Sequence, residues 1–106
     1  MATKHFDSAS FNAAVAQGGV MLVDFWAGWC GPCRMLGPII DQLSEDYDGR
    51  VIVGKVNVDD EPMLAHQFGV MSIPNVVILK DGKEVDRLVG VQPKANFVEK
   101  LDKALS

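Results

Sequence analysis

Two cysteines placed where a buried strand meets a long helix constrain this chain more than any other feature. Residues 20–26 are apolar at every position except Asp24, which is typical of a central strand covered on both faces. The segment Cys30-Gly31-Pro32-Cys33 follows, and apolar residues then recur at helical spacing over residues 32–47. The pattern therefore predicts a β-strand that leads into an α-helix, with both cysteines at the start of that helix.

Strand and helix patterns alternate along the rest of the chain before it ends in a hairpin and a last helix. Before the cysteines we expect a weak first strand and a helix over 8–18 capped by Ser8. After the long helix we expect a strand over 51–58, a short helix that closes at Gly69, and strands over 76–79 and 85–89 joined by the Asp81-Gly82 turn. The last element is a helix behind Pro93 with Phe97, Leu101 and Leu105 on its buried face. This order predicts one α/β domain over residues 1–106, a mixed central sheet of about five strands flanked by about four helices.

Composition and charge exclude several classes of protein. The longest apolar runs, residues 20–23 and 76–79, are far shorter than the roughly 18 residues that cross a bilayer. Lysine and arginine number 10 against 14 aspartates and glutamates, so the formal charge of -4 gives nucleic-acid phosphates little attraction. The first residues lack the continuous apolar stretch of a secretory signal. We therefore expect a cytoplasmic protein that contacts no membrane and no nucleic acid.

The spacing of the two cysteines suits redox chemistry. Cys30 lies at or just before the first helical turn, where unpaired N–H groups and the helix dipole favour a thiolate over a thiol. Cys33 is about one turn further on, so the two sulfurs can close a disulfide. Pro32 fixes its own φ, which limits how far the backbone differs between dithiol and disulfide. We expect the more exposed Cys30 to attack a substrate disulfide and Cys33 to resolve the mixed disulfide.

A structural disulfide and a zinc site are the other interpretations of these cysteines. A bridge that closes a loop of about four residues stabilises a chain by only about 2 kcal/mol, against about 4.7 kcal/mol for a loop of roughly 100 residues. A zinc site needs about four ligands, and His5 and His66 stand far along the chain from the cysteines and from each other. The residues therefore favour redox chemistry, and no metal site is expected.

Asp24 is the one charged residue in the strand that leads to the cysteines. A resolving thiol in apolar surroundings holds its proton, so a nearby base is needed, and Asp24 is the candidate. Burying a carboxylate without a partner costs roughly 1 to 3 kcal/mol, which makes Lys55 on the neighbouring strand its expected partner. The alternative is a satisfied structural Asp24 and a Lys55 that is merely solvated.

Motifs distributed over essentially the whole chain resemble the thioredoxin family. These motifs are Asp24-Phe25-Trp26-Ala27-Gly28-Trp29-Cys30-Gly31-Pro32-Cys33-Arg34, Pro38, Ile73-Pro74 and the Asp81-Gly82 hairpin, each at the family's spacing. The resemblance implies the thioredoxin fold and the activity of a protein-disulfide reductase, a thiol–disulfide oxidoreductase. It further implies Cys30 as the nucleophile, Cys33 as the resolving thiol, Asp24 as the buried proton acceptor and Lys55 as the neighbour of that acceptor.

The resemblance also implies a substrate-docking surface around the cysteines. X-Pro bonds are cis in only about 5 to 6% of cases, so the residues alone favour a trans bond before Pro74. The resemblance implies instead a cis Pro74 that faces the dithiol, and an Ile73 backbone that pairs with an extended segment of the substrate. The implied apolar surface comprises Trp29, Gly31, Pro32, Ile73, Pro74 and Gly90.

The implied redox centre is the reversible Cys30–Cys33 disulfide, with no cofactor bound by the chain itself. Electrons would come from NADPH through a flavin-containing thioredoxin reductase, or from ferredoxin through a ferredoxin-linked reductase. They would pass to disulfide-containing target proteins. A monomer is the expected state.

The sequence departs from the family pattern at three positions, namely Gly28 where a larger residue is common, Gly37 where alanine is usual, and Asn75 where threonine often follows the proline. The two glycines are expected to loosen the surroundings of the motif, and Asn75 is expected to affect substrate preference. Two other functions stay open. One is a disulfide oxidase or isomerase, which the Gly-Pro dipeptide disfavours by resemblance. The other is a binding or processivity subunit that uses the same surface without its thiols.

Overall fold

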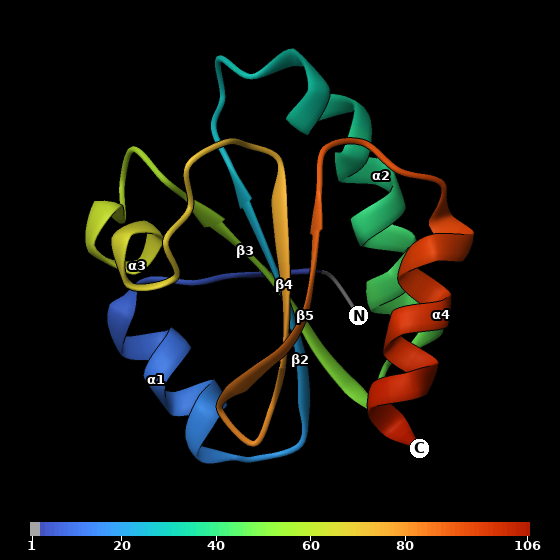
Figure 1. The fold of residues 1–106 in the computed structure, drawn as a ribbon. Helices are drawn as coiled ribbons and strands as arrows, with labels where there is room; N and C mark the ends of the chain where they lie inside the picture. Colours follow the sequence, from blue (N-terminus) through green and yellow to red (C-terminus); the bar gives the residue numbers. More distant parts are fainter. Residues whose placement is uncertain (1–2) are drawn as a thin grey trace.

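A five-stranded mixed sheet forms the centre of the protein, and helices cover both of its faces. The structure is a computed structural model that describes residues 3–106. Its elements are β1 (Lys4–His5), α1 (Ser8–Ala16), β2 (Val20–Trp26), α2 (Gly31–Asp46), β3 (Val51–Asn57), α3 (Pro62–Gln67), β4 (Asn75–Lys80), β5 (Lys83–Val89) and α4 (Lys94–Leu105). The strand order is β1-β3-β2-β4-β5, with the first three parallel and the last two antiparallel to their neighbours. Helices α1 and α3 cover one face, and α2 and α4 cover the other (Figure 1). The predicted architecture is confirmed.

Each face of the sheet has its own hydrophobic core because the side chains of β2 alternate between the two faces. Leu22 packs into the cluster that contains Leu36 of α2. Phe25 packs into the opposite cluster, which contains Phe11 of α1. Asp24 lies two residues from Leu22 and therefore points toward the face covered by α2 and α4.

The strand before the cysteines and the helix that they begin have the bounds that the sequence predicts, within a residue, whereas β5 begins at Lys83, two residues before the predicted start. Strand β2 spans the predicted residues 20–26, and α2 begins at Gly31. The hairpin between β4 and β5 turns at Asp81 and Gly82, whose φ angles are 51° and 82°. Positive φ at both central residues is what a type I′ turn requires, and this turn matches the twist of the two strands.

Two details of the helices differ from the prediction. Asp7 rather than Ser8 caps α1, because its carboxylate accepts a hydrogen bond from the Ser10 N–H at 2.8 Å while the Ser10 hydroxyl accepts one from the Asp7 N–H at 2.9 Å. Helix α1 also ends at Ala16, before the predicted residue 18. In α4 the expected burial of Leu105 is wrong: the buried residues are Phe97, Leu101 and Ala104, and Leu105 is exposed at the end of the helix.

Candidate active site

The two cysteines begin α2 and form a disulfide. Cys30 is the N-cap of the helix, with extended backbone angles, and its Sγ accepts a hydrogen bond from the Cys33 N–H at 3.2 Å. Cys33 lies in the first turn, with a Cα–Cα distance of 5.3 Å to Cys30. An N-cap sulfur receives the orphan N–H groups and the positive end of the helix dipole, so the position stabilises a thiolate once the bond is reduced.

Both sulfurs are largely enclosed in the disulfide form. Cys30 is 5% exposed and Cys33 is 3% exposed, so the expected difference in exposure is small in this state. Ala27 completes this buried cluster, and Ile73 packs against it. The Sγ atom of Cys30 lies 3.9 Å from the Ile73 carbonyl oxygen.

The Ile73–Pro74 peptide bond is cis, as the resemblance implies. Pro74 stands immediately before β4, where its lack of an N–H removes no ladder bond. Its carbonyl oxygen accepts a hydrogen bond from the Gly90 N–H at 2.8 Å, just beyond the end of β5. Gly90 has a φ of 85°, which a larger residue adopts only with strain. The strand ends therefore bring Ile73, Pro74 and Gly90 together.

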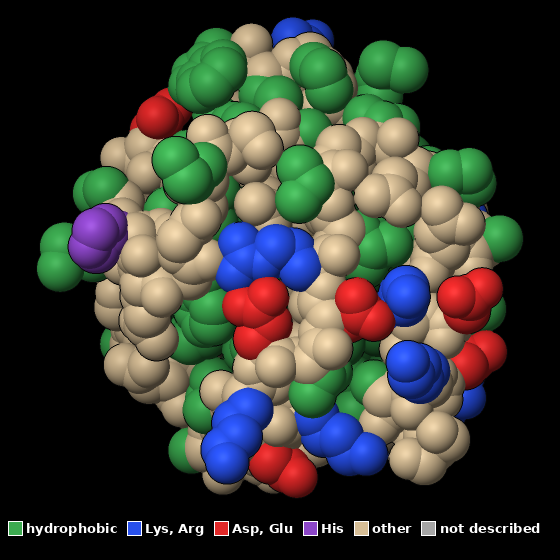
Figure 2. All heavy atoms as spheres, in the orientation of Figure 1, with side chains coloured by type: hydrophobic (Ala, Val, Ile, Leu, Met, Phe, Trp, Pro, Cys, Tyr) green, Lys and Arg blue, Asp and Glu red, His purple; other side chains and the backbone are tan. Residues whose placement is uncertain are grey.

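An apolar groove lies beside Ile73, which packs against the cysteines, and we call this the outer side of the dithiol. It has a volume of about 320 Å³ and is lined by Trp29, Val58, Ala65, Val70, Met71, Ser72 and Ile73. Trp29 is 71% exposed, and its indole N–H donates to the Asp59 carboxylate at 2.9 Å. Gly31 and Pro32 are exposed at the start of α2. Figure 2 shows hydrophobic side chains exposed at the end of the molecule where the loop between β2 and α2 lies, whereas charged side chains gather lower on this face.

A second, smaller cavity lies on the inner side of the dithiol. Its volume is about 220 Å³, and its lining residues are His5, Asp24, Trp26, Cys33, Arg34, Gly37 and Lys55. The structure thus brings Asp24 and Cys33 to one cavity. His5 also reaches it despite its distance along the chain, because β1 pairs with β3 in the register that sets His5 opposite Lys55.

Asp24 is only 1% exposed, and its Oδ1 atom has no hydrogen-bond partner among the described residues. Burial disfavours the charged carboxylate and raises the pKa of Asp24 to about 7. The positive charge of Lys55 opposes this rise, and the negative charge of Asp41 adds to it. Asp24 is therefore a carboxyl group that can exchange a proton near neutral pH.

Lys55 is beside Asp24, but it forms an ion pair with Asp41 instead of the expected one with Asp24. The two residues are opposite each other in the β2–β3 register. The Lys55 Nζ atom instead lies 3.3 Å from the Asp41 Oδ1 atom of α2. The pattern of the strands does not predict this ion pair with Asp41, because it depends on how α2 packs across β3.

Two more buried side-chain atoms at this end of the sheet lack a hydrogen-bond partner within the part of the chain that the structure describes. They are Trp26 Nε1 and Asn75 Oδ1. Trp26 ends β2, and Asn75 begins β4 directly after the cis proline. Unpaired polar atoms therefore gather around the dithiol, which is a recurring property of functional sites.

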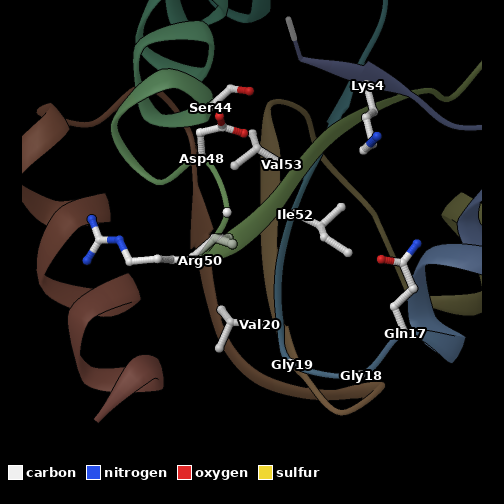
Figure 3. Close-up of a pocket in the computed structure, with 12 residues that line it drawn as sticks. Lys4, Gln17, Gly18, Gly19, Val20, Ser44, Asp48, Arg50, Ile52 and Val53 are labelled. Atoms are coloured by element: carbon white, nitrogen blue, oxygen red, sulfur yellow. The ribbon is translucent and has the colours of Figure 1, made fainter. Parts of the chain in front are cut away.

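A larger cavity lies at the opposite end of the sheet and has a different character. It has a volume of about 350 Å³ and lies where β2 and β3 begin. Figure 3 shows that the polar ends of Lys4, Gln17 and Arg50 are spread around it and do not converge on one point. It contains no cysteine. This cavity is therefore not the centre of the chemistry.

Residues 3–106 contain neither a metal-binding cluster of side chains nor a membrane-spanning helix. No group of three or more His, Cys, Asp or Glu side chains in residues 3–106 could hold a metal ion. No helix in the same range is long and apolar enough to cross a membrane.

Comparison with known proteins gives consistent matches over most of the chain. The family model described as Thioredoxin matches residues 2–103. A thioredoxin from Staphylococcus haemolyticus is 54% identical over 89 residues, which are 84% of this chain and 86% of that protein. A thioredoxin from Staphylococcus aureus strain Mu50 is 48% identical over 105 residues, which are 99% of this chain and 100% of that protein.

Proposed function

The chain belongs to the thioredoxin family and is a thiol–disulfide oxidoreductase that reduces protein disulfides, and from this premise we propose the roles of its residues. We propose that Cys30 is the nucleophile and Cys33 the resolving thiol, within a single domain over residues 1–106. The observation that carries this assignment is the position of Cys30 as the N-cap of α2, with the Cys33 N–H on its sulfur. A thiolate at that position is stabilised and aimed out of the helix.

The proposed reaction has two exchange steps. The Cys30 thiolate attacks one sulfur of a substrate disulfide; that bond breaks, and the other substrate sulfur leaves as a thiolate that takes up a proton. Cys33 then loses its proton and attacks the Cys30 sulfur, so the mixed disulfide breaks and the second substrate sulfur is released as a thiol. Two electrons have moved to the substrate, and the Cys30–Cys33 disulfide is the oxidised product.

Asp24 is the proposed acceptor of the Cys33 proton. It shares the inner cavity with Cys33, and its pKa of about 7 allows it to take up and release a proton at neutral pH. Lys55 lines the same cavity and is proposed to modulate Asp24 through its charge. Lys55 itself transfers no proton in the proposed exchange.

The substrate is proposed to dock on the outer side of the dithiol. The proposed contact residues are Trp29, Gly31, Pro32, Ile73, Pro74 and Gly90. The apolar groove beside Trp29 supports this, because it can bury the side chains of an extended segment. The backbone of Ile73 would pair with that segment in the manner of an added strand.

Family membership implies a reductase and disulfide-containing targets as partners, and thioredoxins need no bound cofactor. We propose that the reductase draws its electrons from NADPH through a flavin or from ferredoxin, and that the protein acts as a monomer in the cytoplasm, without a membrane or nucleic-acid partner.

Reduction of insulin disulfides by dithiothreitol tests the two cysteine roles. Cys30→Ser is expected to abolish turnover, because the nucleophile is lost. Cys33→Ser is expected to keep the first step and to accumulate a mixed disulfide that mass spectrometry detects. Catalysis that survives Cys30→Ser would overturn the assignment. Absence of insulin reduction in the unaltered protein, with partner affinity that survives both substitutions, would favour a binding subunit instead.

Single-turnover kinetics of the second step test the role of Asp24. Asp24→Asn keeps the shape of the side chain but cannot accept the proton, so the step is expected to slow by about 100-fold. In the unaltered protein the rate is expected to rise with pH through about 7, as Asp24 ionises, and the Asn variant is expected to lose that rise. Equal rates for the two proteins near neutral pH would remove Asp24 from the mechanism.

A further inference from the structure

The lysine opposite Asp24 is held away from it. Lys55 and Asp24 are paired residues of β3 and β2, so the lysine starts beside the carboxyl group. Its Nζ atom nevertheless lies 3.3 Å from Asp41, and Asp24 Oδ1 keeps no hydrogen-bond partner among residues 3–106. An ammonium group that could neutralise a buried carboxylate is thus engaged by a second carboxylate at the rim of the cavity.

Asp41 is itself fixed in place. The Thr3 hydroxyl donates a hydrogen bond to Asp41 Oδ1 at 2.6 Å, the same oxygen that faces Lys55. This bond holds the pKa of Asp41 below its usual value, so Asp41 stays charged wherever Asp24 titrates. Three elements therefore meet at this oxygen: the segment before β1, strand β3 and helix α2.

The surface of α2 allows the lysine to lie there. A Cβ atom built on Gly37 would stand 3.6 Å from Lys55 Nζ, so the ammonium group rests close to the helix one turn before Asp41. The Lys55 side chain is 14% exposed, so little water screens its charge. A modest displacement of this side chain would therefore change the electrostatic potential at the Asp24 carboxyl group.

The other charged or titratable groups around Asp24 come from every element that packs on this side. They are Lys55 of β3, His5 of β1, and Cys33, Arg34 and Asp41 of α2. Among them only Asp41 is seen to pair with Lys55. Asp41 is therefore the group that decides where the nearest cation lies.

We propose that Asp41 is a positioning residue: by holding the Lys55 ammonium group at the rim of the inner cavity, it leaves the Asp24 carboxyl group without a cationic partner and so sets the pH range in which Asp24 takes the Cys33 proton. The proposal rests on the role of Asp24 given above. In this arrangement Thr3 orients Asp41, and Asp41 orients Lys55. Because Lys55 forms no ion pair with Asp24, its charge only partly opposes the effect of burial, and Asp24 stays protonated to higher pH.

The direct test is the titration of Asp24, followed by the ¹³C chemical shift of its carboxyl carbon in the unaltered protein and in Asp41→Asn. Removing the Asp41 charge frees Lys55 to approach Asp24, which favours the carboxylate. The midpoint of the titration is expected to fall by about one pH unit. Asp41→Glu, which keeps the charge on a longer side chain, is expected to restore most of the original midpoint.

A matched control is available on the same helix. Asp46 forms an ion pair with Lys94 at 2.6 Å, and its side chain is exposed to a similar extent as that of Asp41. Asp46→Asn also removes one carboxylate and one surface ion pair from α2, but it lies outside the inner cavity. The Asp24 titration is expected to be unchanged in this control. A shift equal to that of Asp41→Asn would overturn the proposal in favour of a general effect of net charge.

A double-mutant cycle separates the action through Lys55 from the direct repulsion between the two carboxylates. If Asp41 acts by positioning the lysine, then Asp41→Asn should shift the Asp24 midpoint by less than half as much in a Lys55→Met background. Equal shifts in both backgrounds would contradict positioning. Thr3→Val, which leaves every charge in place, is expected to give a smaller shift in the same direction as Asp41→Asn.

The rate of the second exchange step distinguishes failure of this inference from failure of the proposed function. If the Asp24 midpoint falls and the pH profile of the second step falls with it, both are supported. If the Asp24 midpoint falls while the profile stays in place, Asp41 positions Lys55 but Asp24 is not the base. An unmoved Asp24 midpoint in Asp41→Asn overturns the inference, whatever the kinetics show.

Discussion

The two ends of the central sheet differ in how completely their polar groups are satisfied. At the dithiol end, three buried atoms of Asp24, Trp26 and Asn75 have no hydrogen-bond partner among the described residues. At the opposite end the turns bond to each other: the Gly19 N–H donates to the Asp81 carboxylate at 2.8 Å, and the Asp81 N–H donates to the Gly19 carbonyl at 2.9 Å. Yet the cavity at that opposite end, about 350 Å³, is larger than either cavity beside the dithiol, which are about 320 Å³ and about 220 Å³.

Unsatisfied polar groups therefore mark the chemistry of this fold better than the volume of a cavity does. A buried polar atom without a partner costs free energy, so a fold that keeps several of them in one place must hold them by packing elsewhere. Here the two hydrophobic clusters on either face of β2 supply that packing.

The largest effect is expected in the pH dependence of stability. Asp24 has a pKa of about 7 in the folded protein against an ordinary value of 3.8, so its contribution to folding is greatest below pH 4 and is lost as the pH rises through 7. A difference of about three pKa units corresponds to about 4 kcal/mol. The free energy of unfolding of Asp24→Asn, relative to the unaltered protein, should therefore rise by about that amount between pH 4 and pH 8.

Urea unfolding at several pH values measures this difference, and subtracting the two proteins cancels the titration of the other carboxylates. Asp7 and Asp41, whose pKa values are lowered, lose their contributions at low pH in both proteins alike. If the difference in free energy of unfolding between the two proteins stayed constant from pH 4 to pH 8, the ionisation of Asp24 would not destabilise the folded protein.

A tenfold effect on substrate binding is expected from Trp29→Ala. The indole ring is exposed beside the groove, so its removal takes away about 1.5 kcal/mol of apolar contact with a docked protein substrate and raises KM about tenfold with little change in kcat. Trp29→Phe keeps an aromatic ring and loses only the bond to Asp59, so it should raise KM less. Steady-state kinetics at varied concentrations of the disulfide substrate would measure KM for both variants. An unaltered KM for the alanine variant would place docking elsewhere.

The smallest effect is expected at the opposite end of the sheet. Asp81→Gly keeps the positive φ of the turn but removes the side-chain bond to the Gly19 N–H, so the free energy of unfolding should fall by about 1 kcal/mol. The rate of insulin reduction should stay within error of the unaltered protein. A folded variant that lost activity would break the contrast between the two ends.

The sequence predicts the parts of the site that depend on local patterns. The bounds of β2 follow from an apolar run, and the position of Cys30 follows from the strand-to-helix junction. The Asp81-Gly82 turn is equally local, because only a few residue types adopt positive φ without strain. These features need no knowledge of what packs against them.

The parts that the sequence does not predict depend on contacts between distant segments. The pairing of Lys55 with Asp41 arises where α2 crosses β3, and the approach of His5 to the inner cavity arises from the register of a two-residue strand. Neither has a periodic signal. The cap of α1 is a closer case, since Asp7 and Ser8 are both good capping residues and only the bond to Ser10 decides between them.

The central place of β2 has a consequence for how the protein meets its targets. This strand pairs along its length with β3 on one edge and along six of its seven residues with β4 on the other. Its amide protons should therefore exchange with deuterium only when the whole molecule opens. If the sheet beneath the cysteines does not open, we expect that a folded target adapts its own segment to reach them.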